Sequence, residues 1–250
     1  GESKGLPLSK EYMRAFPRSY KEDMMPGSAV ADIERLEALS EDNKLGMLFY
    51  RPQEEAADSK AVRLKLFYQS AEPIHLSDVM PMLENFGLRV IGESPYEVRK
   101  TNGTTYWILD FSMLHKSDQT IDLREARDLF QQAFAAIWAG ELDSDGFNRL
   151  VLGAGLAGRE ISILRAYARY MRQVGFPFSQ QYIEDTLSHY PDLAKGLVSL
   201  FGKRFDPKLR GSAKGQQDLI KKITEQLDHV ESLDDDRIIR RYMEMITATL

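Results

Sequence analysis

The chain has 250 residues, of which 43% are hydrophobic, 28% charged and 10% aromatic. This is the composition of a folded globular protein with one or two domains, and it excludes wholesale disorder. A formal net charge of −5 disfavours a generic nucleic-acid binder, because phosphate contacts need clustered Lys and Arg. Since the sequence has no cysteine, disulfides, thiolate nucleophiles and Cys-ligated zinc are excluded.

No apolar run approaches the ~18 residues that a membrane span needs, and no basic and apolar leader opens the sequence. We therefore expect a cytoplasmic protein that binds no membrane. The last helical stripe, from Ile239 to Leu250, meets no Gly or Pro stop signal, which leads us to expect a cut fragment.

Residues 1–44 predict an N-terminal arm with short helices. A short helix is expected around residues 11–16, followed by an irregular segment because prolines recur at positions 17 and 26. Ser28 is then expected to cap a helix that reaches about Leu39 and carries an apolar stripe.

The clearest local pattern in the sequence is a strand over residues 62–68. Apolar residues there alternate with Arg63 and Lys65, as in a strand with one buried face. Residues 45–50 form a second, shorter strand candidate, and an acidic loop over residues 52–60 separates the two. The sequence thus predicts a sheet whose charged positions face water.

A helix, a strand and a hairpin are expected next. Ser77 or Asp78 caps the helix, which tolerates Pro81 in its first turn, and Gly87 suits a left-handed stop. Residues 88–99 predict a strand broken near Gly92 and Pro95.

Asn102-Gly103 predicts the hairpin turn that leads into a strand over residues 106–113. Apolar residues at helical spacing over 123–137 then predict another helix. The resulting order is βαββα, most of a ferredoxin-like unit, and the strand at 45–50 is placed to supply its fourth strand.

The fold class is therefore α+β, in three parts. Residues 1–44 are the arm, residues 45–141 the ferredoxin-like sheet domain, and residues 142–250 an all-helical region. The helical assignment follows from apolar stripes that recur at 3.6-residue spacing to the end of the chain, with few prolines to interrupt them.

One motif in the helical part is typical of nucleotide binding. Gly153, Gly155 and Gly158 match GxGxxG, in which glycines let the backbone approach a pyrophosphate. However, no βαβ pattern surrounds the motif, and no acidic residue lies about 20 residues further on. The competing interpretation is close helix packing permitted by small residues, and a small nucleotide-binding enzyme stays the third hypothesis.

Other chemistry leaves weaker patterns. The four histidines have no i+3 or i+4 partner histidine for a helical metal site, and the nucleophile motif GxSxG is absent. Arg165, Arg169 and Arg172 share a helix face, and basic residues cluster around residues 203–214. Both are interpreted as solvated surface, with contacts for nucleic acid or for an acidic partner as the alternative. No catalytic, cofactor-binding or metal-binding residue is predicted.

The βαββα pattern is shared by two functional classes. RNA-binding domains stack bases on strand aromatics, and Tyr106, Trp107 and Phe111 lie on such a strand, but the basic-Gly-aromatic signature is absent. Regulatory modules use loops at the end of the sheet. The candidate effector contacts are, in this case, Glu72, His75, Ser77, Asp78 and Gly87.

Seven stretches resemble the large bacterial NAD-specific glutamate dehydrogenases. They are FPRSYKED at 16–23, AVADI at 29–33, RLKLF at 63–67, PIHLSD at 73–78, LENFGLRV at 83–90, NRLVL at 148–152 and LRAYARYMRQ at 164–173. The resemblance spans nearly the whole chain, in order. One departure is Gly158, where the family often has an aromatic residue.

The resemblance implies the end of the long N-terminal regulatory part, with an ACT-like domain and helical motifs before the catalytic region. The parent enzyme oxidises L-glutamate to 2-oxoglutarate and ammonium with NAD as hydride acceptor, so NAD belongs to the parent and no cofactor to this segment. The implied partners are the catalytic domain of the same chain, other subunits of a homo-oligomer and a small amino-acid effector. The alternative is an RNA-binding adaptor.

Overall fold

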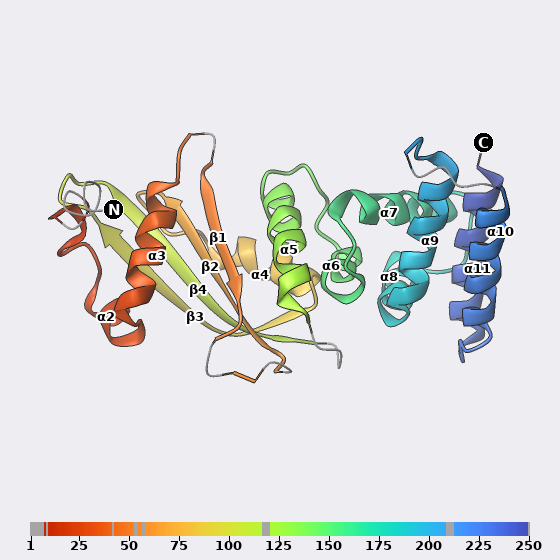
Figure 1. Cartoon of the computed structure of the whole chain (residues 1–250), viewed down its shortest axis with the longest axis horizontal. Helices are drawn as coiled ribbons and strands as arrows, with labels where there is room; N and C mark the ends of the chain where they lie inside the picture. Colours follow the sequence, from red (N-terminus) through yellow and green to blue (C-terminus); the bar gives the residue numbers. More distant parts are fainter. Residues whose placement is uncertain are drawn as a thin grey trace. The chain divides into compact units, whose positions relative to one another are not determined.

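The computed structural model describes residues 8, 10–41, 43–52, 55–56, 59–116, 121–208 and 213–249. The chain divides into two compact units, one formed by residues 1–84 and 88–123 and the other by residues 85–87 and 124–250. Figure 1 shows that the strands belong to the first half of the chain and that helices make up the second. Among the described residues, none of the helices has the length and apolar character of a membrane span.

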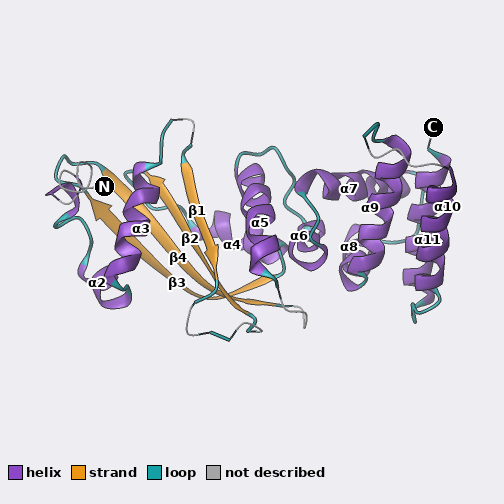
Figure 2. Ribbon diagram, viewed as in Figure 1, coloured by secondary structure: helices purple, strands orange, loops and turns teal. Residues whose placement is uncertain are grey.

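Four strands form one antiparallel sheet in the order β1-β2-β4-β3. The strands are β1 (Leu45–Tyr50), β2 (Ala61–Gln69), β3 (Leu88–Arg99) and β4 (Thr105–His115), drawn in orange in Figure 2. Helix α4 (Leu76–Asn85) connects β2 to β3. The predicted ferredoxin-like order is confirmed, and β1 takes the place of the fourth strand.

Strand pairing fixes which residues share a face of the sheet. Leu64 lies opposite Phe111 on one face, and Phe67 lies opposite Ile108 on the other. All four side chains are fully buried. Both faces of the sheet are therefore covered, whereas the alternation in β2 had predicted one wet face.

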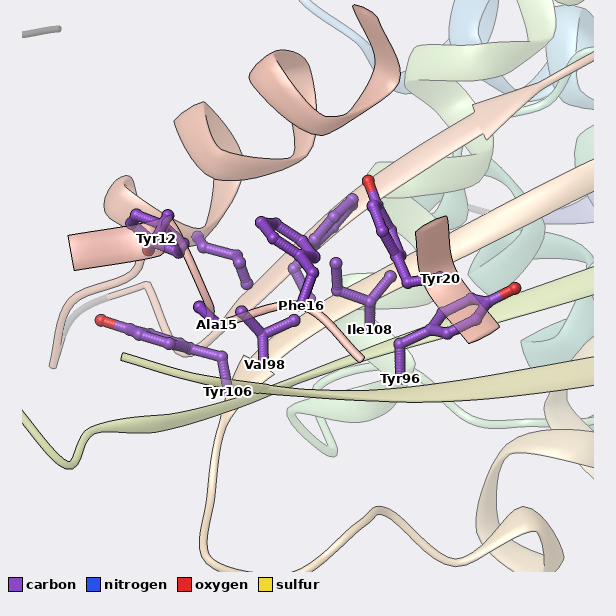
Figure 3. Packing of buried hydrophobic residues seen from close by; sticks show 10 residues of the cluster. Tyr12, Ala15, Phe16, Tyr20, Tyr96, Val98, Tyr106 and Ile108 are labelled. Atoms are coloured by element: carbon purple, nitrogen blue, oxygen red, sulfur yellow. The ribbon is translucent and has the colours of Figure 1, made fainter. Parts of the chain in front are cut away.

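The second face is covered by the N-terminal helices α2 (Arg18–Asp23) and α3 (Pro26–Glu37). Aromatic residues from this arm pack on the sheet, as Figure 3 shows for Phe16 and Tyr20 beside Tyr96 of β3. The ring centroids of Phe16 and Tyr20 are 4.4 Å apart, and Tyr20 meets Tyr96 edge-on at 5.2 Å. Such pairs add to the free energy of burial, so the arm is an integral part of the first unit.

The arm differs from the prediction at two points. Helix α2 occupies the segment that was expected to be irregular. Helix α3 begins at Pro26 with Met25 as N-cap, and not after Ser28. Proline favours this first helical position because its φ is already helical and its missing N–H has no intrahelical acceptor there.

Strand β3 runs through Gly92 and Pro95 without the predicted break. The irregularity is a register shift between Val90 and Gly92, and Pro95 stays paired with Leu109. Because β3 is an edge strand, the N–H that proline lacks can be missing without loss of a ladder hydrogen bond. The predicted break was therefore wrong, because the position of β3 at the edge of the sheet lets the strand continue through a proline.

The turns around α4 are placed nearly as expected. Gly87 has φ of 79°, which confirms the left-handed stop. Helix α4 already begins at Leu76, so Ser77 and Asp78 lie inside it and do not cap it as predicted. Pro81 accordingly lies in its second turn and not in its first. In the hairpin, Gly103 has φ of 89° and its N–H donates to the Lys100 carbonyl at 3.0 Å.

The described residues from 123 onward are mainly helical, as predicted. Its elements are α5 (Leu123–Trp138), the 3-10 turn η1 (Gly146–Asn148), α6 (Arg149–Ala154), α7 (Gly158–Gln173), α8 (Gln180–His189), α9 (Pro191–Phe205), α10 (Ala213–Leu227) and α11 (Leu233–Ala248). Tyr242 of α11 is fully buried and donates to the Leu164 carbonyl of α7 at 3.0 Å. Ser232 caps α11 at the Asp235 N–H, ahead of an acidic first turn.

Candidate functional site

The predicted effector contacts lie at the start of α4 and in the loop before it. Glu72, His75, Ser77 and Asp78 are all exposed. The His75 carbonyl accepts from the Asp78 N–H at 3.0 Å, and the Ser77 hydroxyl lies 3.5 Å from the Asp78 carboxylate. The structure thus brings three of these residues together in one helix-start turn.

The loop is fastened to the sheet by Tyr68, whose hydroxyl accepts from the Ile74 N–H at 2.6 Å. Burial raises the pKa of Tyr68 to about 12, so this phenol stays neutral. Gly87 is buried and belongs to the second compact unit. That these residues bind an effector remains a prediction.

A buried ionic cluster lies between the arm and the sheet, and it was not predicted. Asp32 of α3 accepts from Lys65 of β2 at 2.6 Å and from the Tyr20 hydroxyl at 2.7 Å. Lys65 is only 2% exposed and Asp32 only 1%. Lys65 was expected on a solvated face, and it is buried because α2 and α3 cover that face.

Asp110 of β4 extends this cluster along the sheet. The Arg63 guanidinium approaches both of its carboxylate oxygens at 3.0 Å. Burial raises the pKa of Asp110, although the charges of Arg63 and Lys65 oppose the rise. The sheet thus contributes two cations and one carboxylate, and the arm contributes the second carboxylate through Asp32, an arrangement suited to fixing the position of the arm.

A second ionic cluster joins the arm to the residue that follows β3. Lys100, at the end of β3, lies 2.6 Å from the Glu11 carboxylate and 2.9 Å from that of Glu37. Glu37 also accepts from the Tyr12 hydroxyl at 2.7 Å. Burial disfavours the charged form of Lys100, but its hydrogen bonds to the two glutamates outweigh this and raise its pKa. Charges therefore join the arm to the sheet at two places, Lys65 and Lys100.

In the helical unit, the arginines of α7 hold a loop. Arg165 is 3% exposed and makes two hydrogen bonds to Asp145, at 2.6 and 2.8 Å. Arg169 pairs with Asp143 at 2.9 Å. Arg165 and Arg169 thus hold the segment that leads into η1, whereas Arg172 is exposed and donates to Gln180 at 3.4 Å.

The three-glycine motif lies in a helix–turn–helix, and no strand leads into it. Gly153 lies in the last turn of α6. Gly155 is the left-handed C-cap of that helix with φ of 63°, and Gly158 is the first residue of α7. A Cβ at Gly158 would lie 2.9 Å from Leu142 Cδ2. The geometry is that of a capped turn packed closely on a neighbour, as the packing interpretation proposed.

Three hollows are described in the structure, and residues other than the predicted effector contacts line them. The first, of about 530 Å³, is mainly apolar and includes Tyr167, Tyr170 and Phe201. The second, of about 360 Å³, lies within the arm and includes Tyr12 and Met13. The third, of about 380 Å³, lies between α9 and α10 and is mainly polar.

Two of the three aromatic residues that suggested RNA binding are buried in the core, and Trp107 is partly buried. Tyr106 packs beneath the arm, and Phe111 is fully buried on the other face. Base stacking needs an open platform of aromatic rings, so the sheet gives this alternative no support.

These features define an α+β protein with a ferredoxin-like sheet of the ACT type, an N-terminal arm and a helical unit. Three family models match it. Residues 1–39 match glutamate dehydrogenase helical motif 2, residues 44–126 the ACT3 domain and residues 142–207 helical motif 3.

Whole-chain similarity points to the same family. The chain is 47% identical over 250 residues to the NAD-specific glutamate dehydrogenase of Halomonas elongata, 41% over 254 residues to that of Pseudomonas aeruginosa and 32% over 255 residues to that of Mycobacterium tuberculosis. These matches take in 99% to 100% of this chain but only 15% to 16% of each relative. The chain belongs to the NAD-specific glutamate dehydrogenase family, as a segment with an ACT domain and helical motifs.

Proposed function

We propose that this chain is a non-catalytic regulatory and assembly segment of an NAD-specific glutamate dehydrogenase. The parent reaction converts L-glutamate, NAD and water to 2-oxoglutarate, ammonium and NADH. The observation that carries the proposal is the match of the whole chain to about 15% of such enzymes, through ACT and helical-motif models. In this proposal NAD binds elsewhere in a cytoplasmic parent protein.

The packing of the first unit supports a regulatory role. The arm is joined to the sheet through the charges of Asp32, Lys65 and Lys100, so a displacement of one is transmitted to the other. Coupling between sites in proteins is typically ~1–3 kcal/mol. A small amino-acid effector that favours one position of the arm would thus be coupled to the catalytic domain and to neighbouring subunits by a free energy of this size.

The apolar hollow of the helical unit supports an assembly role. Tyr170 is 54% exposed beside it, and Phe201 and Ile163 also line it. Contiguous exposed apolar surface of this kind marks interaction sites in soluble proteins. In the full-length enzyme, Tyr170→Asp should lower the oligomeric state in size-exclusion chromatography, whereas Gln173→Asp, exposed on the same helix outside the hollow, should not.

The catalytic claim is tested on the purified chain. With L-glutamate and NAD it should produce no NADH, while the full-length enzyme under the same conditions should. Turnover that rises in proportion to the concentration of the pure chain would show that the segment is itself catalytic.

A further inference from the structure

Helices α9 and α10 enclose a hollow of about 380 Å³. One stripe of each helix lines it: Asp192, Lys195, Gly196 and Ser199 from α9, and Leu219, Lys222, Ile223 and Gln226 from α10. Within each helix these residues are spaced i, i+3, i+4 and i+7, so they lie on a single face. The two faces therefore meet along the hollow.

The floor of the hollow is formed by Gly196 and Ile223. Ile223 is fully buried, and a Cβ at Gly196 would lie 3.1 Å from its Cγ1. Glycine inside a helix costs ~1 kcal/mol relative to alanine. In this helix it lets the two helices approach closely and leaves space above the floor that a side chain would fill.

Charged side chains of both signs surround this floor. Lys195 and Lys222 bring two ammonium groups and Asp192 one carboxylate, with Ser199 and Gln226 as further polar groups. Within the described part of the chain, none of the three charges has an ion-pair partner within 4.0 Å. By contrast, the neighbouring Lys221 has Glu225 at 3.8 Å.

We propose that this hollow binds an acidic amino acid, a ligand with two carboxylates and one ammonium group. Lys195 and Lys222 would each pair with one carboxylate of the ligand, and Asp192 would pair with its ammonium group. The site carries one net positive charge, which matches the single net negative charge of such a ligand. The volume lies in the ~300–1,000 Å³ range of small-molecule pockets.

The other two described hollows do not offer this chemistry. The apolar hollow has Arg159 as its charged residue, and the hollow of the arm has Lys21. Neither presents a carboxylate for an ammonium group. The inference rests on the regulatory part of the proposed function and names a place and a ligand class for the effector.

The test is calorimetric titration of the 250-residue chain with L-glutamate and L-aspartate. We expect saturable binding of at least one of them, and about tenfold weaker binding in Lys195→Gln and in Lys222→Gln, which corresponds to ~1.4 kcal/mol. Lys221→Gln removes an equal charge beside the site and should leave the Kd unchanged. Asp192→Asn should weaken binding of the amino acid but not of succinate, which lacks the ammonium and should bind more tightly once the repelling carboxylate is gone.

Three results would overturn the inference: no saturable binding of either acid, equal Kd values in all the lysine variants, or glutamine binding as tightly as glutamate. Far-UV circular dichroism checks that the variants are folded, which their exposed positions favour. The proposed function is tested separately by NADH production and by oligomeric state. Failure of the titration would thus remove the effector site and leave the assembly role standing.

Discussion

Asp32 and Lys65 form an ion pair that is almost completely withdrawn from water, with 2.6 Å between Oδ2 and Nζ. Asp32 lies in the part of the chain that matches helical motif 2, and Lys65 in the part that matches the ACT3 domain. Tyr20 donates to the same carboxylate from a second helix of the arm. Two parts that sequence comparison separates are therefore joined through one buried charge.

Because the pair is buried, removing either partner alone should lower the free energy of unfolding by a large amount. Lys65→Met leaves the Asp32 carboxylate buried without its cation, and breaking such a pair costs ~3–5 kcal/mol. We expect a clear fall in the midpoint of thermal unfolding of the first unit. Lys44→Met is the control, because Lys44 is exposed and lies 4.0 Å from Glu41. It should change stability by less than ~0.5 kcal/mol.

The double variant Asp32→Asn with Lys65→Met should recover much of the loss, since Asn still accepts from Tyr20 and no charge remains buried at this point. A Lys65→Met protein as stable as the wild type would mean that the ammonium reaches water and that the arm is held by apolar contacts alone.

The three glycines of the GxGxxG motif predict three different responses to alanine. Gly155 has φ of 63°, where alanine costs ~1–2 kcal/mol. At Gly153 a Cβ would meet nothing within 4 Å, so alanine should stabilise α6 by ~0.5–1 kcal/mol. At Gly158 the Leu142 side chain would have to move.

Thermal unfolding of the three variants measures this order, with Gly153→Ala as the internal control. A nucleotide site would behave differently, because its glycines serve the ligand and not the fold. NAD affinity in the wild-type chain that Gly155→Ala abolishes would contradict the structural role.

The strands were predictable because their signal is local. Alternation fixed β2, short apolar composition fixed β1, and Gly87 marked the end of α4 through its need for positive φ. What covers the sheet is not a local property. Lys65 has the spacing of a solvated residue, and only the packing of α2 and α3 makes it a buried one.

The candidate sites show the same limit. Glu72 and His75 were selected because they lie near the end of a predicted strand, and they are exposed in a loop. The α9–α10 hollow depends on two stripes in different helices that meet only after folding. Helical spacing places Asp192 and Lys195 on one face, but it does not reveal that Lys222 lies across from them.

Glu184 of α8 predicts a dependence of stability on pH. It is 7% exposed, and burial raises its pKa above 4.5, although a hydrogen bond from Gln180 opposes the rise. The folded state therefore favours the neutral carboxyl. This contribution to stability is fully present below about pH 4.5 and is lost as the pH rises through the raised pKa.

Glu184→Gln removes this titration and can still accept from Gln180. The variant should gain stability relative to the wild type as the pH rises from about 4 to about 7, measured as a difference in unfolding midpoint. Glu225→Gln, at an exposed site beside Lys221, should show no such trend. A constant difference across this range would mean that the Glu184 carboxyl is solvated.

The contacts of Arg165 predict that the planar shape of its guanidinium, and not its charge alone, holds the loop that precedes α6. Its guanidinium makes two parallel hydrogen bonds to Asp145 and a third to Asn148 at 3.2 Å. Lysine keeps the charge but cannot reproduce this planar arrangement. We expect Arg165→Lys to destabilise the helical unit by ~1–3 kcal/mol, since buried acceptors lose their donors, and Arg165→Met by more.

Arg169→Lys is the matched control. Arg169 lies one turn further along α7, its side chain is half exposed, and it pairs with Asp143 at 2.9 Å. Exposed pairs contribute ~0–1 kcal/mol, so this change should be nearly silent. Hydrogen exchange then locates the effect: in Arg165→Lys the amides of η1 should lose protection first, because Asp145 caps that turn. Uniform loss of protection throughout the helical unit would show that Arg165 supports the whole core and not this loop.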